Sequence, residues 1–203
     1  MVRCAHTLIF ADKLTDASYI ALAVEIAAVA LSFAGVLLAI KPHILNWPVS
    51  MAGTLLYSWV FYECRLYSDM VLQFVFIGIQ TLGWWQWALK KTAESPISSL
   101  TPWQWLAESL TFLAGWYGWT RIILLWAPDA AMPWLDSFTA SISVWAIALQ
   151  ARRKWENWIL WLLADIIYIP LYISMGKPLT AGLYAVFLAL AVIGLRSWYR
   201  QRV

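Results

Sequence analysis

Long apolar stretches, separated by short polar segments, run through nearly the whole of this 203-residue sequence. A helix needs about 20 predominantly apolar residues to cross a bilayer. Seven stretches meet this requirement: 19–40, 44–62, 69–89, 104–126, 133–151, 156–174 and 179–197. The pattern therefore predicts an all-α integral membrane protein with seven transmembrane helices.

The segments between these stretches are too short to hold a soluble domain. The longest runs from Lys90 to Pro102 and is rich in Ser, Thr and Pro, which is typical of a loop. Residues 1–17 carry several charges and lack the continuous apolar run of a cleavable signal peptide, so we expect a short N-terminal tail.

Composition supports a membrane protein, because 63% of the residues are hydrophobic and only 12% are charged. A globular chain usually carries about 25% charged residues. The net charge of +3 is not gathered into a basic stripe, which argues against nucleic-acid binding. Cys4, Cys64, His6 and His43 stand apart from one another, so we expect no disulfide framework, no metal and no cofactor.

The distribution of Lys and Arg between the two sides predicts an external N-terminus and a cytoplasmic C-terminus, since cytoplasmic loops are enriched in these residues. The C-terminal side receives nine: Lys41, Lys90, Lys91, Arg152, Arg153, Lys154, Arg196, Arg200 and Arg202. The other side receives five: Arg3, Lys13, Arg65, Arg121 and Lys177. Among the 16 Trp residues, we interpret five as interfacial belt residues: Trp103, Trp105, Trp126, Trp134 and Trp198.

An internal repeat becomes visible when the chain is compared with itself at an offset of 111 residues, without a gap. Rarer residue types match at this offset, including an Asn-Trp pair, an acidic pair and a Gly-x-x-x-Trp ending. The matches are Glu25 with Asp136, Ser32 with Ser143, Lys41 with Arg152, Asn46 with Asn157, Trp47 with Trp158, Tyr57 with Tyr168, Gly83 with Gly194 and Trp87 with Trp198.

The repeat predicts two parallel three-helix units joined by one linking helix, a 3+1+3 arrangement. A three-helix unit begins and ends on opposite sides of the membrane, so two parallel copies require one additional crossing between them. We divide the chain into a tail (1–17), a first repeat (18–89), a loop with the linking helix (90–127) and a second repeat (128–203). Parallel repeats of this kind are found in transporters, with the binding site near mid-membrane.

One helical face of the sixth stretch combines aromatic side chains with a carboxylate. Trp158, Trp161, Asp165, Tyr168 and Tyr172 follow one another at helical spacing. An ionisable residue deep in a membrane helix faces a partner or a cavity, which makes Asp165 the leading functional candidate. A carboxylate tied to a hydroxyl of a neighbouring helix is the structural alternative. Pro170 predicts a kink just beyond Asp165.

The third stretch carries a second polar stripe that includes Gln73 and Gln80. These side chains either form hydrogen bonds between helices or contact a ligand. In the first repeat, Thr54 stands at the position of Asp165 and Ser50 at the position of Trp161. This divergence predicts one asymmetric substrate held mainly by the second half. Aromatic faces beside a carboxylate suit a planar, cationic ligand.

These residues resemble the PnuC family of bacterial vitamin transporters. The resemblance covers about residues 18–200 and rests on Glu156-Asn157-Trp158-Ile-Leu-Trp161 with a polar residue at 165, on Leu66-Tyr67 followed by Leu72-Gln73, and on Gly83-Trp84-Trp85-Gln86-Trp87. It implies an inner-membrane facilitator for nicotinamide riboside that feeds NAD biosynthesis, with phosphorylation inside the cell trapping the substrate. It also implies a homotrimer.

The same resemblance implies that Trp158 and Trp161 surround the substrate, that position 165 hydrogen-bonds it, and that Gln73 and Tyr168 complete the pocket. We add Gln80 and Trp47 as candidate substrate-binding residues. Asp165 departs from the Asn that is typical of nicotinamide riboside carriers. Thiamine is also cationic and stays an alternative, whereas an ionised carboxylate argues mildly against neutral riboflavin.

Two other classes of function compete with a transporter. An intramembrane enzyme would need converging reactive groups, and the candidates are Glu25 and Asp136, to which we assign a structural or gating role. A selective pore is the other alternative, although bulky aromatic side chains favour an occluding site. Proton coupling through Asp165 is a further hypothesis.

Overall fold

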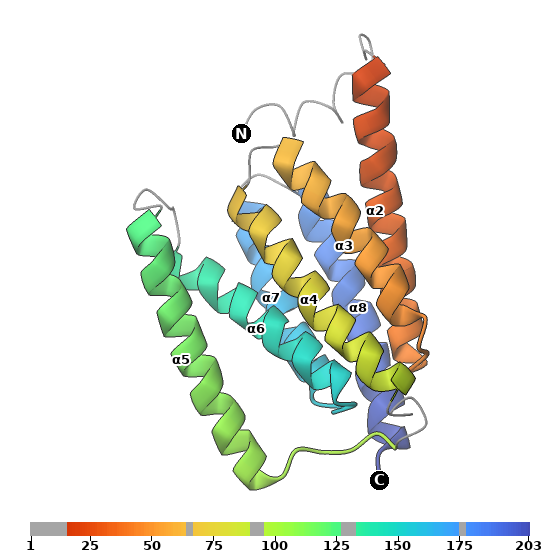
Figure 1. Cartoon of the computed structure of the whole chain (residues 1–203), viewed down its shortest axis with the longest axis vertical. Helices are drawn as coiled ribbons and strands as arrows, with labels where there is room; N and C mark the ends of the chain where they lie inside the picture. Colours follow the sequence, from red (N-terminus) through yellow and green to blue (C-terminus); the bar gives the residue numbers. More distant parts are fainter. Residues whose placement is uncertain (1–15, 64–66, 90–95, 127–132, 175–177) are drawn as a thin grey trace. The chain divides into compact units, whose positions relative to one another are not determined.

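The computed structural model describes residues 16–63, 67–89, 96–126, 133–174 and 178–203, which form seven α-helices (Figure 1). The helices are α2 (Asp16–Ile40), α3 (Asn46–Glu63), α4 (Tyr67–Leu89), α5 (Pro102–Trp126), α6 (Pro133–Ala151), α7 (Asn157–Ser174) and α8 (Pro178–Gln201). Each predicted stretch matches one helix to within a few residues at its ends. The all-α, seven-helix prediction is confirmed for this part of the chain.

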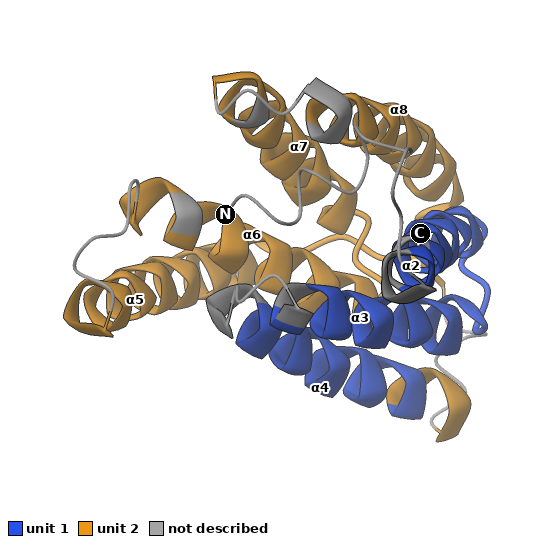
Figure 2. Ribbon diagram, turned by 90° about the horizontal axis from the view of Figure 1, so that it is seen from above, with its two compact units in different colours: residues 1–85 blue, residues 86–203 orange. Residues whose placement is uncertain are grey.

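The chain divides into two compact units, Met1–Trp85 and Gln86–Val203 (Figure 2). Unit 1 holds α2, α3 and most of α4, and unit 2 holds α5 to α8. Most of the predicted tail, Cys4, His6 and Cys64 lie outside the described residues, as does the side chain of Asp136.

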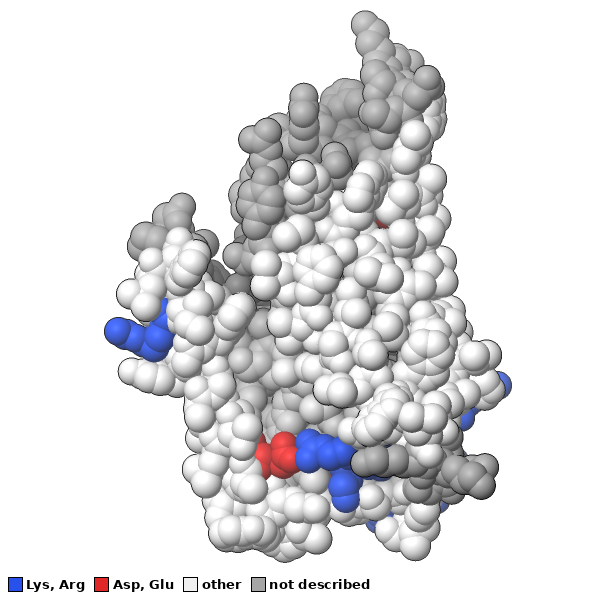
Figure 3. All heavy atoms as spheres, viewed as in Figure 1, with Lys and Arg blue, Asp and Glu red and all other residues white. Residues whose placement is uncertain are grey.

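Within the described residues, two helices are apolar enough to cross a membrane on hydropathy alone. They contain Ala23–Ile40, with a mean hydropathy of 2.3, and Ala181–Gln201, with 1.7. Hydroxyls in other helices bond to the backbone one turn earlier, as Thr120 does to the carbonyl of Trp116 at 2.8 Å. On the face drawn in Figure 3, few charged side chains interrupt the surface of the described helices.

In unit 1, small residues let α2 and α3 approach closely. Gly35 lies directly against Ser50, and a Cβ at Gly53 would lie 2.9 Å from Ser32 Oγ. Asn46 begins α3, and its Nδ2 donates to the carbonyl of His43 at 2.6 Å. Close contact between small residues is a common way for membrane helices to associate, because the packing force between them is van der Waals contact.

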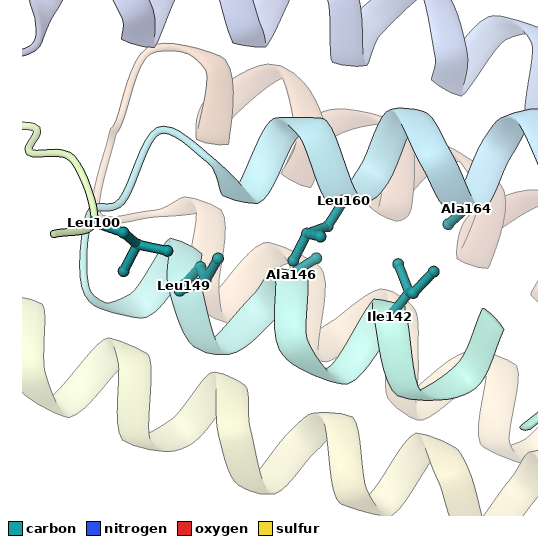
Figure 4. Close-up of a cluster of buried hydrophobic side chains, with 6 residues drawn as sticks. All are labelled: Leu100, Ile142, Ala146, Leu149, Leu160 and Ala164. Atoms are coloured by element: carbon teal, nitrogen blue, oxygen red, sulfur yellow. The ribbon is translucent and has the colours of Figure 1, made fainter. Parts of the chain in front are cut away.

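In unit 2, α6 and α7 form a hairpin around a small apolar core. Its buried residues are Leu100, Ile142, Ala146, Leu149, Leu160 and Ala164 (Figure 4). Leu160 and Ala164 face α6 from α7, which fixes the orientation of α7 about its own axis (Figure 4). Asn157 begins α7 as Asn46 begins α3, with Nδ2 donating to the carbonyl of Lys154 at 2.6 Å.

The turn between α6 and α7 closes with a hydrogen-bond pattern that usually requires glycine. The Lys154 N–H bonds to the Leu149 carbonyl at 3.0 Å, and the Arg153 N–H bonds to the Gln150 carbonyl at 3.0 Å. This is a Schellman motif, whose C′ residue adopts a left-handed conformation. Arg153 takes that place with φ 55°.

The guanidinium of Arg153 is buried and lies 4.7 Å from the centre of the Trp87 ring. Its Nε and Nη1 make no hydrogen bond within the described residues. Burial lowers the pKa of Arg153 from its ordinary value. The indole of Trp87 in turn donates to the carbonyl of Ala151 at 2.8 Å, so the end of α4 is fastened to the end of α6 within unit 2.

Residues 96–101 run as an extended strap across this turn. The Ser98 N–H bonds to the Arg153 carbonyl at 3.1 Å, and the Val203 N–H bonds to the Ile97 carbonyl at 3.0 Å. Glu156, 1% exposed, accepts the N–H of Leu100 at 2.6 Å. The strap ends in a capping box, in which Thr101 and Gln104 bond reciprocally to each other's backbone N–H at the start of α5.

The linking helix α5 packs on α6 through aromatic rings. Phe112 stacks on Trp145 at 5.2 Å between ring centres and meets Phe138 edge-on at 5.4 Å. Glu108 adds an ion pair with Arg152 and accepts the indole N–H of Trp145 at 2.9 Å. Figure 3 shows acidic and basic side chains touching at one place on this face.

The expectation that all five tryptophans form an interfacial belt is corrected at Trp198. Trp103 and Trp126 are 75% and 86% exposed, as belt residues are, whereas Trp198 is 0% exposed and meets Trp158 edge-on at 6.0 Å. Sequence position near a helix end suggested the bilayer interface. Because the C-terminal end of α8 packs on α7, Trp198 is buried in protein.

Candidate functional site

The seven predicted substrate-binding residues are divided between the units. Unit 2 carries four of them on α7, namely Trp158, Trp161, Asp165 and Tyr168, and unit 1 carries Trp47 on α3 with Gln73 and Gln80 on α4. The positions of the α7 residues follow from the orientation of that helix.

Helix α7 presents three directions to its surroundings. Leu160 and Ala164 face α6, whereas Trp158 faces α8, where its ring lies against Gly194. At 100° per residue, Trp161, Asp165 and Tyr168 fall on the arc between these two directions. The described part of the predicted stripe, from Trp158 to Tyr168, therefore lies on one broad arc, with Trp158 at the edge that faces α8. The side chain of Tyr172, its last predicted member, lies outside the described residues.

Asp165 is 4% exposed, and no hydrogen bond joins its carboxylate to any of the described residues. A buried carboxylate with no internal partner is costly in a membrane helix, which is why such groups are expected to serve a ligand or a cavity. The structural alternative, a carboxylate tied to a hydroxyl of a neighbouring helix, is not realised among these residues.

Aromatic side chains flank Asp165 along the helix. Trp161, one turn before it, and Tyr168, one turn after it, both pack against the α6–α7 core. Tyr168 also stacks on Tyr184 of α8 at 4.6 Å between ring centres. The arrangement offers flat, polarisable surfaces on both sides of a negative charge, which favours a planar cation.

Tyr184 was missed by the sequence analysis, although a signal for it existed. It stands 111 residues after Gln73, so it is the second-repeat equivalent of a residue that was singled out. Phe187 follows it on α8, with ring centres 6.2 Å apart. The aromatic cluster that begins at Tyr168 thus includes side chains from α8 as well as from α7.

In unit 1, the equivalent positions are occupied by contacts between helices. Gln80 Nε2 donates to Thr54 Oγ1 at 3.2 Å, and both side chains are buried. Trp47 is 1% exposed and lies against Gly83, where a Cβ would stand 2.6 Å from the indole. Gln73 is partly exposed on α4. A part for these three residues in substrate binding stays a prediction.

Trp158 repeats the packing of Trp47. A Cβ at Gly194 would stand 2.6 Å from its ring, and its Nε1 is a buried donor with no partner within the described residues.

Glu25 is partly buried on α2. The gating or structural role of Glu25 and Asp136 stays a prediction.

Comparison with known proteins gives a consistent result. The model of the family described as nicotinamide mononucleotide transporter matches residues 22–200. A riboflavin/roseoflavin transporter, RibM of Streptomyces davaonensis, is 26% identical over 167 residues, which cover 80% of this chain and 78% of that protein.

Two relatives are named nicotinamide riboside transporter PnuC. The Neisseria mucosa protein is 29% identical over 175 residues, covering 78% of this chain and 65% of the relative. The Escherichia coli protein is 23% identical over 189 residues, covering 79% and 78%. A crystal structure of the vitamin B3 transporter PnuC has the same fold, with a TM-score of 0.69, 24% identity and coverage of 99% of this chain and 97% of that one.

Proposed function

Because this chain belongs to the nicotinamide mononucleotide transporter family over residues 22–200, we propose that it takes up nicotinamide riboside across the bacterial inner membrane. The family is one of membrane transporters, so the competing assignment as an intramembrane enzyme is set aside. Two relatives carry the name of nicotinamide riboside transporter, which supports this substrate.

The observation that carries the proposal is the buried, internally unpaired carboxylate of Asp165 between Trp161 and Tyr168. The nicotinamide ring of the substrate is planar and cationic. Such a ring can stack on the aromatic side chains while its charge is balanced by Asp165. The attraction is strong in a site from which water is excluded.

Transport by facilitated diffusion needs no coupling ion, and phosphorylation of the substrate inside the cell keeps the inward gradient. The basic residues at the α6–α7 turn and at the end of α8 support a cytoplasmic C-terminus and an external N-terminus. We extend the proposal to a homotrimer, following the family resemblance.

Riboflavin is the second candidate, because a relative that is 26% identical is named a riboflavin transporter. The ring system of riboflavin is flat and neutral, so it would use the aromatic surface without the counter-charge. Thiamine is cationic and would use both. The two cationic vitamins should therefore gain affinity from Asp165, whereas riboflavin should not.

The test is calorimetric titration of the purified protein with nicotinamide riboside, thiamine and riboflavin, repeated with Asp165→Asn. We expect nicotinamide riboside to bind and Asp165→Asn to weaken it at least tenfold. Glu108→Gln is the matched control, since it removes a carboxylate that bonds Trp145 and Arg152 and should leave the affinity within about twofold. Binding of riboflavin alone would refute the proposed substrate.

Uncoupled transport is tested in liposomes that contain the purified protein and no kinase. Labelled substrate should equilibrate to equal concentrations inside and outside, and an imposed pH gradient should not change that end point. Accumulation driven by the pH gradient would show proton coupling and contradict facilitated diffusion. Uptake that does not saturate with substrate concentration would favour a pore.

A further inference from the structure

The two repeats differ at the position of Asp165 and at a second position on the following helix. In unit 1, Thr54 on α3 meets Gln80 on α4, and Gln80 donates a hydrogen bond to the threonine hydroxyl. At the offset of 111 residues, Thr54 corresponds to Asp165 and Gln80 corresponds to Ala191. The second repeat thus has a carboxylate on one helix and a methyl group on the other.

The equivalence holds in space, because the same neighbouring contact occurs in both units. Trp47 lies against Gly83 in unit 1, and Trp158 lies against Gly194 in unit 2, each with a virtual Cβ 2.6 Å from the indole. The third helix of each repeat therefore packs on the second in the same register.

A second line of geometry places Ala191 opposite Asp165 within unit 2. Trp158 meets Trp198, while Tyr168 meets Tyr184, so α7 and α8 run antiparallel. Asp165 lies seven residues after Trp158, and Ala191 lies seven residues before Trp198. Seven residues return to nearly the same face of a helix, so the two positions face each other between these aromatic contacts.

We propose that Ala191 is a specificity-determining residue: its methyl group withholds from Asp165 the hydrogen bond that Gln80 gives Thr54, and so leaves the carboxylate for the cationic substrate. Ala191 is 2% exposed, so water does not replace the missing donor from its side. An amide donor at this position would satisfy the carboxylate internally, and the substrate would then compete with that bond. The inference rests on the proposed role of Asp165 in substrate binding.

The same comparison shows how the first repeat differs at the positions of Asp165 and Trp161. There, the hydroxyl of Thr54 donates to the Ser50 carbonyl at 2.9 Å and accepts from Gln80, so its hydrogen bonds are made inside the protein. Ser50 lies directly against Gly35, which leaves no room for a ring at the position of Trp161.

The test replaces Ala191 with Gln, with Met as the matched control of similar length and no hydrogen-bond donor. We expect Ala191→Gln to raise the Kd for nicotinamide riboside at least tenfold, and Ala191→Met to raise it no more than about threefold. Equal losses in both variants would mean that bulk alone matters and would overturn the proposal. An unchanged Kd in Ala191→Gln would overturn it as well.

A stability cycle keeps this inference separate from the proposed substrate. The double variant Asp165→Thr/Ala191→Gln rebuilds the Thr54–Gln80 pair in the second repeat. Its Tm should therefore be higher than the Tm expected when the shifts of the two single variants are added. Additive Tm shifts would show that positions 165 and 191 do not face each other. If the wild-type protein binds no vitamin while the cycle shows coupling, the proposed substrate fails and the control of Asp165 by position 191 stands.

Discussion

Gly194 lies so close to Trp158 that a Cβ on the glycine would stand 2.6 Å from three atoms of the indole. Gly83 has the same relationship to Trp47 in the first repeat. Real Cβ atoms do not approach a ring this closely, so each tryptophan fills the space that a missing side chain provides. The contact is the structural reason for the Trp of the two matched Asn-Trp pairs and for the Gly of the two Gly-x-x-x-Trp endings.

Gly194→Ala should therefore destabilise the protein by about 1–3 kcal/mol, because the added methyl group forces Trp158 or α8 to move. The measurement is the Tm in detergent, with unfolding monitored by tryptophan fluorescence. Gly182→Ala on the same helix is the control, since no atom lies within 4 Å of its virtual Cβ. That change should stabilise α8 by up to about 1 kcal/mol. A Gly194→Ala protein as stable as Gly182→Ala would contradict the close contact.

Removal of the Glu108 carboxylate should loosen α5 from α6. Glu108→Ala breaks the bonds to Arg152 and Trp145, and we expect a loss of about 1–2 kcal/mol, because the pair is partly exposed. A double-mutant cycle with Arg152→Met measures the coupling by thermal unfolding. Full additivity of the two changes would show that the ion pair contributes no stability.

The helices were predictable because membrane crossing requires long, predominantly apolar segments. In this sequence such segments are separated by short polar ones, so their bounds can be read directly. The prediction 133–151 coincides with α6, and 104–126 differs from α5 by two residues at the start. The strap at residues 96–101 was not predictable beyond its being a loop. Its bonds to Arg153 and Glu156 depend on tertiary contacts that leave no periodic pattern in the sequence.

At position 153 a glycine variant should be more stable than an alanine variant, which is the reverse of the usual order inside a helix. Arg153 holds a left-handed conformation, which costs a residue with a Cβ about 1 kcal/mol and costs glycine nothing. Both Arg153→Ala and Arg153→Gly lose the contact with Trp87, so both should lower the Tm. Arg153→Gly should be the more stable of the two, by about 1 kcal/mol. Equal stability would show that the turn relaxes around alanine.

Glu156 should be essential for the strap, because its Oε1 accepts a buried backbone N–H. Glu156→Ala leaves the N–H of Leu100 without an acceptor, and we expect a loss of about 1–3 kcal/mol. Glu156→Gln retains an acceptor oxygen at this place and should retain most of the stability. Hydrogen exchange at Leu100 is the direct measurement. Slow exchange in Glu156→Ala would mean that another group takes over the bond.

The candidate site was predictable only as a stripe on one helix. Helical spacing placed Trp158, Trp161 and Asp165 on a common arc. An arc of this width faces two neighbouring helices, and the sequence does not show which residue contacts which helix. The structure assigns Trp158 to the contact with α8, whereas Trp161 packs with the α6–α7 core. Likewise, the sequence could not show that Gln80 donates a hydrogen bond to Thr54, because this contact joins two helices.

The linking helix has a consequence for symmetry. Two identical three-helix units would assemble as a homodimer with two equal ligand sites, and every substitution would appear in both copies. Covalent fusion through α5 frees each copy to change alone. The first repeat has the internal pair of Thr54 and Gln80, whereas the second has Asp165 and Ala191 at the corresponding positions. A single chain therefore permits the two halves to differ at positions where two identical subunits would have to be the same.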